Sequence, residues 1–281
     1  MNTKTRFFTN AALASAITLG LASQAVAQQD WDAINEETLR HFRALLQFDT
    51  SDPPGRELLA AEYIRDVLEA EGFEVEMLAN NDERPNVVTR LKGNGSKEPL
   101  LIMAHTDTVN VDPDKWTFPP FSATVDGGYV YGRGAVDDKD NLAAGLMVML
   151  ELKRQGIKLD RDVIFLAESG EEGATEFGIE FMINEHFDKI ESEFCLAEGG
   201  SVARVNREVQ YAGIQSVEKI PYQINLTATG VAGHGSVPLQ TNPVVRLAKA
   251  MAAVADWPSP TRLNETTAAY FERLAGISPP D

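Results

Sequence analysis

The chain has 281 residues, of which 43% are hydrophobic, and its formal net charge is −17 at pH 7. This length fits one large domain or two smaller ones, and the hydrophobic content is ordinary for a globular protein. The negative charge argues against nucleic acid and anionic membranes as partners, because both would repel it. A solvated acidic surface without a charged partner is the simplest interpretation of this charge.

Residues 1–27 have the pattern of a secretory signal peptide. Lys4 and Arg6 precede the apolar stretch AALASAITLGLA, which is too short to span a bilayer, and the AVA at 25–27 fits a cleavage site. An amphipathic N-terminal helix is the alternative, but the segment has no acidic residue and no polar face. No later apolar run is long enough for a membrane span. We therefore expect a secreted, periplasmic protein, cleaved after Ala27, whose mature form does not bind membranes.

Periodicity and helix breakers predict an alternating series of elements. Helices are expected at 31–47, 56–71, 141–155, 175–187 and from 242 or 243 to about 257, and strands at 73–78, 86–91, 100–104, 162–167, 194–197 and 222–229. Strands that alternate with helices predict an α/β fold with a doubly wound, mostly parallel sheet. The pattern changes near residue 216, so we expect one domain at 28–215 and the start of another at 216–281.

The single cysteine, Cys195, lies in the apolar run FCLA of the strand expected at 194–197. One cysteine cannot form an internal disulfide, even in an oxidising compartment. No base beside it would activate it as a nucleophile. We therefore expect a buried, small apolar side chain.

Acidic and histidine side chains follow four of the predicted strands or turns. They are His105 and Asp107, Asp137 and Asp138, Glu171 and Glu172, and Glu198. Each pair alone is a weak signal, because adjacent acids often simply begin a helix. The carboxyl ends of parallel strands, however, lie at one edge of a sheet, where several carboxylates would repel one another without a cation. A mixture of histidine and carboxylate suits zinc, with manganese or cobalt as alternatives.

Three nearby features are interpreted as structural. Asp138 is expected to begin a helix rather than to bind metal, and Glu168 is expected to face away from the site. Gly132-x-Gly134 resembles a dinucleotide-binding loop only weakly. We reject a dinucleotide site here because the third glycine position is Asp137.

The motifs HTDTV, YGRGAVDDKDN, GEEG and AEGG, in this order and spacing, resemble a family of zinc-dependent metallopeptidases. It includes aminoacylase, carboxypeptidase S, acetylornithine deacetylase and succinyl-diaminopimelate desuccinylase (peptidase M20/M25/M40 type). The resemblance covers residues of about 31–260, and AEGG and GHGSVP favour the carboxypeptidase S-like branch. It implies a zinc exopeptidase-like fold with an inserted α+β lid or dimerisation domain, of which this chain holds the start.

The resemblance also implies the metal ligands of a site that holds two zinc ions. His105 and Glu198 would bind the first zinc, and Glu172 would bind the second. Asp137 would bridge the two ions.

Three further residues receive catalytic roles from the resemblance. Asp107 would orient a ligand imidazole, Glu171 would be the general base, and His234 would polarise the substrate carbonyl, often across a dimer interface. The metal ions would lower the pKa of a bridging water, whose proton Glu171 would take and deliver to the leaving amine. The expected reaction is hydrolysis of a peptide or linear amide bond in a small peptide or N-acyl amino acid, by a carboxypeptidase or an amidohydrolase.

The sequence departs from the family at its end. Members continue past the lid and supply a further histidine to the second zinc, whereas no histidine follows His234 here. We therefore expect a C-terminally truncated chain in which the first zinc site is complete and the second lacks a ligand. The alternative function is a catalytically incompetent fragment that only binds metal or forms a homodimer through its lid.

Overall fold

The computed structural model describes residues 29–220 and 222–278, which form two units that divide between Leu196 and Ala197. The predicted signal peptide at 1–27 lies outside the described residues. Within the described part of the chain, no helix combines the length and the apolar character that a bilayer crossing requires. The domain predicted from residue 216 stays a prediction.

The first unit is built on a five-stranded sheet with the order β2-β3-β8-β4-β9. These strands are β2 (Val75–Leu78), β3 (Asn86–Leu91), β8 (Val163–Glu168), β4 (Leu100–His105) and β9 (Phe194–Leu196). β4 is parallel to both β8 and β9, whereas β3 is antiparallel to β8 and to β2. Only β3 therefore runs against the other four strands, which confirms the predicted α/β fold with a mostly parallel sheet.

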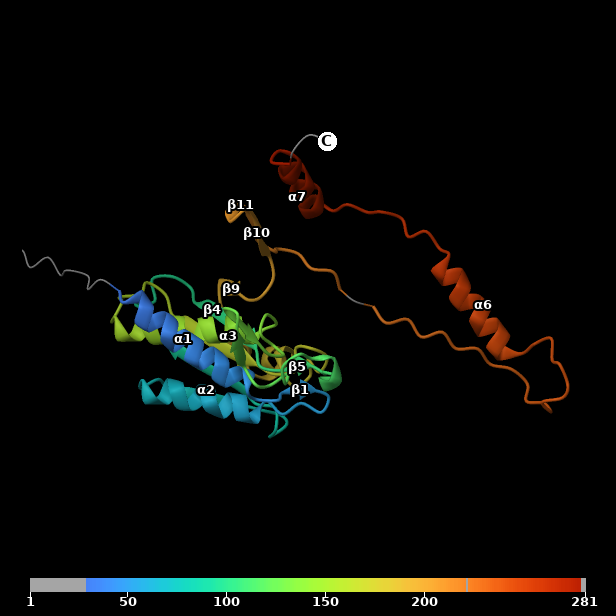
Figure 1. Cartoon of the computed structure of the whole chain (residues 1–281), viewed down its shortest axis with the longest axis horizontal. Coiled ribbons are helices and arrows are strands. Elements are labelled where there is room, and N and C mark those ends of the chain that lie inside the picture. The colour runs from blue at the N-terminus through green and yellow to red at the C-terminus, as the bar shows by residue number, and fades with distance from the viewer. Residues whose placement is uncertain (1–28, 221, 279–281) are drawn as a thin grey trace, which may run out of the picture. The chain divides into compact units, whose positions relative to one another are not determined.

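Helices cover both faces of this sheet (Figure 1). One face packs against α1 (Trp31–Leu46), α2 (Leu58–Ala70) and α3 (Lys139–Arg154), which supply most of the main hydrophobic core. The other face packs against α4 (Ile179–Glu185) and α5 (Phe187–Ile190). The layers of the first unit therefore have the doubly wound arrangement that the sequence predicts.

The central strand β8 shows why two layers form. All of its residues are buried, and consecutive side chains point to opposite faces. Val163, Phe165 and Ala167 pack with the α1–α3 layer, whereas Ile164 and Leu166 pack with the α4–α5 layer. A strand buried on both faces must be apolar at nearly every position, as this run is.

Short strand pairs extend the first unit beyond the sheet. β1 (Ser51–Asp52) pairs in parallel with β5 (Thr108–Val109), and β6 (Thr124–Asp126) forms an antiparallel hairpin with β7 (Tyr129–Tyr131). A 3-10 turn, η1 (Pro113–Lys115), lies between β5 and β6. Because β5 begins three residues after β4 ends, its pairing with β1 fixes the segment that leaves the carboxyl end of β4.

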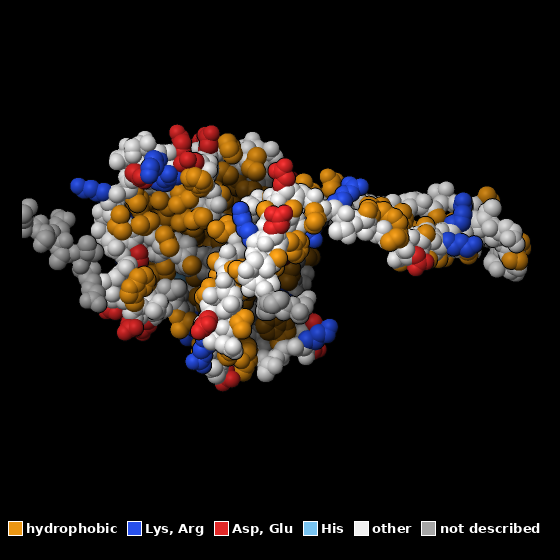
Figure 2. Space-filling model, turned by 90° about the horizontal axis from the view of Figure 1, so that it is seen from above, with side chains coloured by type: hydrophobic (Ala, Val, Ile, Leu, Met, Phe, Trp, Pro, Cys, Tyr) orange, Lys and Arg blue, Asp and Glu red, His pale blue; other side chains and the backbone are white. Residues whose placement is uncertain are grey.

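The second unit contains a hairpin of β10 (Ser201–Val205) and β11 (Glu208–Gly213), followed by α6 (Pro243–Ala255) and α7 (Glu265–Ala275). No residue of α6 or α7 is buried. Hydrophobic side chains, drawn in orange in Figure 2, are exposed on α6, where they include Val244, Val245, Met251 and Val254.

Three predictions from the sequence are wrong. Residues 222–229 alternate in polarity but form no strand, because no neighbouring strand in the described residues supplies hydrogen-bond partners. The helix predicted at 175–187 begins only at Ile179 and divides at His186. Cys195 is exposed, because β9 is the edge strand of the sheet and no helix of the first unit covers it.

Candidate active site

The candidate site lies at the carboxyl end of β4. His105 is the last residue of that strand, and Asp107 lies between β4 and β5; both side chains are almost fully buried. The turn between them is anchored to β8, since the N–H and the hydroxyl of Thr106 both donate to the carbonyl of Glu168, each at 2.8 Å. The ends of two adjacent parallel strands therefore fix the direction of the imidazole.

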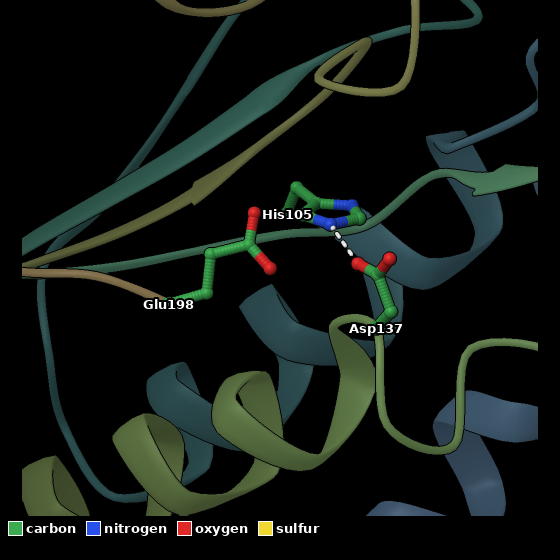
Figure 3. A group of neighbouring side chains, drawn as sticks. All are labelled: His105, Asp137 and Glu198. Atoms are coloured by element: carbon green, nitrogen blue, oxygen red, sulfur yellow. Dashed lines mark hydrogen bonds and ion pairs between the residues drawn. The ribbon is translucent and has the colours of Figure 1, made fainter. Parts of the chain in front are cut away.

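Asp137 reaches the same place from the loop that precedes α3. Its neighbour Asp138 is fully buried, accepts the backbone N–H of His105 at 3.2 Å and accepts the Asn141 amide at 2.5 Å. Asp138 therefore joins the start of α3 to the end of β4, as expected of a structural acid. With the loop held in this way, Asp137 Oδ1 lies 2.9 Å from His105 Nε2 (Figure 3).

Asp107 holds two parts of the site together. Its Oδ1 lies 3.3 Å from His105 Nδ1. The two carboxylate oxygens also accept the backbone N–H groups of Glu171 at 3.1 Å and Glu172 at 3.0 Å. One buried carboxylate thus positions both the imidazole and the loop that follows β8.

The two adjacent glutamates point in different directions. Glu171 Oε2 lies 3.8 Å from His105 Nε2, and 41% of this side chain is exposed. Glu172 Oε1 instead accepts the N–H of Val109 at 3.3 Å. One carboxylate is therefore accessible to water beside the imidazole, while the other is fixed against β5.

The pKa shifts of the site residues reflect an excess of negative charge around His105. Burial alone would lower the pKa of His105, but the carboxylates of Asp107, Asp138 and Asp137 outweigh it and raise the pKa to about 10. Burial would raise the pKa of Asp107, yet His105 and the two backbone N–H groups hold it below its usual value. Burial and the charge of Asp137 raise the pKa of Glu172. A cation among these groups would relieve their repulsion.

Two of the predicted site residues belong to the second unit. Glu198 is the second residue after β9, whose Leu196 lies opposite Ile102 of β4, and Figure 3 draws Glu198 with His105 and Asp137. One histidine and two carboxylates are donor types that zinc accepts. His234 lies exposed in a loop, where Ser236 donates its backbone N–H to the imidazole Nδ1 at 3.3 Å. The roles of both residues stay predictions.

Arg84, Glu57 and Asp52 form a buried ionic cluster that no sequence pattern indicated. Arg84 Nη2 lies 2.6 Å from Glu57 Oε1 and 3.1 Å from Asp52 Oδ2, and its guanidinium group stacks over the ring of Phe177 at 4.7 Å. Asp52 belongs to β1, the partner of β5, and the carbonyl of Arg84 accepts the hydroxyl of Ser169 at 2.9 Å. The cluster therefore links the segments on two sides of the site.

Comparison with known sequences gives the same family as the motifs. The chain matches the sequence model of peptidase family M20/M25/M40 over residues 101–278, more than half of its length. It is 35% identical over 181 residues to the probable carboxypeptidase S-like 2 of Dictyostelium discoideum, covering 61% of this chain and 34% of that protein. It is 32% identical over 206 residues to a probable succinyl-diaminopimelate desuccinylase of Staphylococcus aureus strain Mu50, covering 72% of this chain and 47% of that protein.

Comparison with solved structures gives the same fold. The M20 family metallo-carboxypeptidase Sso-CP2 from Sulfolobus solfataricus matches with a TM-score of 0.52 and 27% identity, over 59% of this chain and 38% of that one. Human carnosine dipeptidase 1 shares the fold, with a TM-score of 0.50 and 19% identity. This match covers 59% of the present chain and 39% of the dipeptidase chain. The chain spans between a third and a half of the length of the two curated relatives named above. The predicted family and fold are confirmed, and the chain belongs to peptidase family M20/M25/M40.

Proposed function

We propose that this chain carries the metal-binding site of a zinc-dependent hydrolase that cleaves peptide or linear amide bonds, as a carboxypeptidase or an N-acyl-amino-acid amidohydrolase. The observation that carries the proposal is the position of Asp107, whose one carboxylate contacts His105 and both backbone N–H groups of the Glu171–Glu172 pair. The names of the relatives, a carboxypeptidase and a desuccinylase, support this class of substrate.

His105, Asp137, Glu172 and Glu198 would hold the metal, as two zinc ions in a complete site, with cobalt or manganese as alternatives. A bound ion would supply a Lewis acid that polarises the substrate carbonyl and makes water more acidic. The close approach of His105 to Asp137, and the negative charge around it, supports this assignment.

The chain itself would supply the proton transfers. Glu171 is exposed beside the imidazole, and its backbone is fixed by Asp107, so its carboxylate can accept a proton from the attacking water. The same group would then deliver that proton to the nitrogen of the leaving amine. His234 would donate a hydrogen bond to the carbonyl oxygen as negative charge develops there.

Replacement of the proposed general base tests this function. The full chain and its Glu171→Gln variant are loaded with zinc and assayed against N-acyl amino acids and dipeptides, with metal content measured by mass spectrometry. Loss of the base should lower turnover by roughly 10²–10⁴-fold while the metal content is kept. Glu176→Gln, an exposed glutamate five residues further on, is the matched control. Full turnover in the Glu171→Gln variant, or in zinc-free protein, would contradict the proposal.

The second candidate is metal binding or dimerisation without turnover. It is favoured by the donor types present, because His105 Nε2 and Asp137 Oδ1 lie 2.9 Å apart and could bind an ion without any catalytic step. About one zinc per chain with no hydrolysis of any substrate in the panel would support it. Light scattering of the purified chain tests the proposed homodimer.

We also propose that the protein is exported to the periplasm and cleaved after Ala27. The basic residues Lys4 and Arg6, followed by a short apolar stretch, support this. N-terminal sequencing of the periplasmic protein should begin at Gln28, and an intact Met1 would contradict cleavage.

A further inference from the structure

A cavity of about 370 Å³ lies in the first unit between the loop before α2 and the loop after β5. Its apolar wall includes Pro53, Pro54, Val111 and Phe121. Small-molecule sites in proteins measure about 300–1,000 Å³, so this cavity has room for one amino-acid residue rather than a long peptide. Neither the motifs nor the proposed mechanism assigns it a role.

The cavity begins next to the candidate active site. Val109 donates its N–H to Glu172, and the following residue, Asn110, lines the cavity. On the opposite wall Ser51 lies in register with Thr108, the residue after Asp107. The cavity therefore adjoins the segment of strand β5 that contacts Glu172.

The polar groups in the cavity wall favour an anion. Arg56 lines the cavity, and among the described residues no carboxylate lies within 4.0 Å of its guanidinium group. Asp49 also lines the cavity, but its Oδ1 already accepts the N–H of Ser51 at 3.2 Å and the hydroxyl of Ser51 at 2.7 Å. Arg56 is exposed, and its guanidinium group can bind a carboxylate through two parallel hydrogen bonds, which would have to outweigh the negative charge of the rest of the chain.

The wall that carries Arg56 is held in place by the buried ionic cluster. Arg84 binds Asp52 and Glu57, which flank the loop at residues 53–56 on both sides. Asn110 donates to the carbonyl of Asp52 at 3.3 Å, so that the two walls are also joined to each other. A cavity with fixed walls loses less conformational entropy when it binds a ligand.

We propose that this cavity is the substrate subsite for a residue that bears both an apolar side chain and a free carboxylate. The apolar side chain lies against the proline and phenylalanine wall, and Arg56 binds the carboxylate. The inference rests on the proposed function, because it assigns the cavity to the substrate of the same site. It narrows the substrate class to peptides or N-acyl amino acids with a hydrophobic residue at the carboxyl end.

Ligand pairs that differ in one charge test the role of Arg56. Binding of N-acetyl-leucine and of its neutral amide, N-acetyl-leucinamide, to the metal-free full chain is measured by calorimetry. Arg56→Gln should weaken binding of the acid by roughly tenfold and leave the amide unchanged, because only the acid loses a charged hydrogen bond. Arg65→Gln, which removes a half-buried arginine of α2 paired with Asp66, is the matched control and should change neither. Equal binding of the acid by the Arg56→Gln variant and the unmodified chain would overturn the proposal.

A second variant tests the apolar wall. Phe121→Ala should weaken binding of N-acetyl-leucine more than that of N-acetyl-alanine, because the longer side chain loses more contact. An equal effect on both ligands would overturn the assignment of the wall. In the zinc-loaded chain, Arg56→Gln should raise KM for N-acyl amino acids with kcat unchanged. If the zinc-loaded chain hydrolyses the substrates but KM is the same in the Arg56→Gln variant, the subsite is contradicted and the proposed function is not. If N-acetyl-leucine binds through Arg56 but no substrate is hydrolysed, the proposed function is contradicted and the cavity remains a binding site.

Discussion

The carboxylate of Asp107 accepts the backbone N–H of Glu171 at 3.1 Å, although the two residues are 64 positions apart in the sequence. The same carboxylate also contacts His105 and accepts the N–H of Glu172. It therefore couples the direction of an imidazole to the position of the loop that carries the proposed general base. Because Asp107 is fully buried, water cannot replace the contacts that its removal would break.

Asp107→Asn should weaken the site without removing any proposed ligand. The amide replaces one acceptor oxygen with an NH₂ donor, which would face either a backbone N–H or the imidazole. Loss of such a supporting contact typically lowers metal affinity by about 10–100-fold, and we expect turnover to fall with it. Competition with a chelating dye measures the affinity. Asp114→Asn, in the exposed turn η1, is the control, and equal metal affinity in the two variants would contradict the role of Asp107.

Arg84→Met should destabilise the first unit strongly. The guanidinium group is 3% exposed and Glu57 is fully buried, so the variant leaves a buried carboxylate without its counter-charge. Breaking one side of a buried pair costs about 3–5 kcal/mol, measured here as the free energy of unfolding in urea. The control is Arg65→Met, whose exposed pair with Asp66 should contribute less than about 1 kcal/mol. Equal stabilities of the two variants would show that the cluster contributes nothing beyond a surface pair.

Periodicity was sufficient to predict the sheet and the edge of the sheet at which the candidate site lies. The strands β4 and β8 are continuous apolar runs, and a run of this kind indicates burial on both faces wherever it folds. Once two such strands are parallel, their carboxyl ends meet, so the segments that follow them must be neighbours. For this reason the sequence alone predicts that His105 lies near Glu171.

No sequence pattern comparable to these apolar runs indicates the buried ionic cluster. Arg84 is separated from Glu57 by 27 residues and from Asp52 by 32, and no local pattern distinguishes a buried arginine from a solvated one. The prediction of a strand at 222–229 was wrong for a related reason. Alternation reports which side chains share a face, but a strand also needs a neighbouring backbone, and that neighbour is not encoded in the segment itself.

The buried amine of Lys139 should make stability depend on pH in the alkaline range. Its Nζ donates to the carbonyls of Leu45 at 3.1 Å and Phe48 at 2.8 Å, and burial lowers its pKa from 10.5 to about 8. Between these two values the unfolded chain binds more protons than the folded chain. The free energy of unfolding should therefore rise with pH across this window, by at most about 3 kcal/mol from this group.

Urea titrations at several values between pH 7.5 and 10.5 measure this rise. Lys139→Met should be less stable at neutral pH, since two carbonyls lose their donor, and it should lack this part of the rise. Lys158→Met, at an exposed position, should retain the full rise. The same slope in both variants would show that another group titrates in this window.

Gly145→Ala should destabilise the first unit, although alanine favours helices more than glycine by about 1 kcal/mol. A Cβ at this position of α3 would lie 2.8 Å from Phe165 Cε2 and 3.1 Å from Ile102 Cγ2. Phe165 is fully buried in the main core, so overpacking should cost about 1–3 kcal/mol and outweigh the gain in helix propensity. Asp140→Ala, an exposed position of the same helix, should change the free energy of unfolding by less than about 0.5 kcal/mol. If Gly145→Ala is instead the more stable variant, α3 can move away from the sheet, and the absence of a side chain at this position is not what allows their close packing.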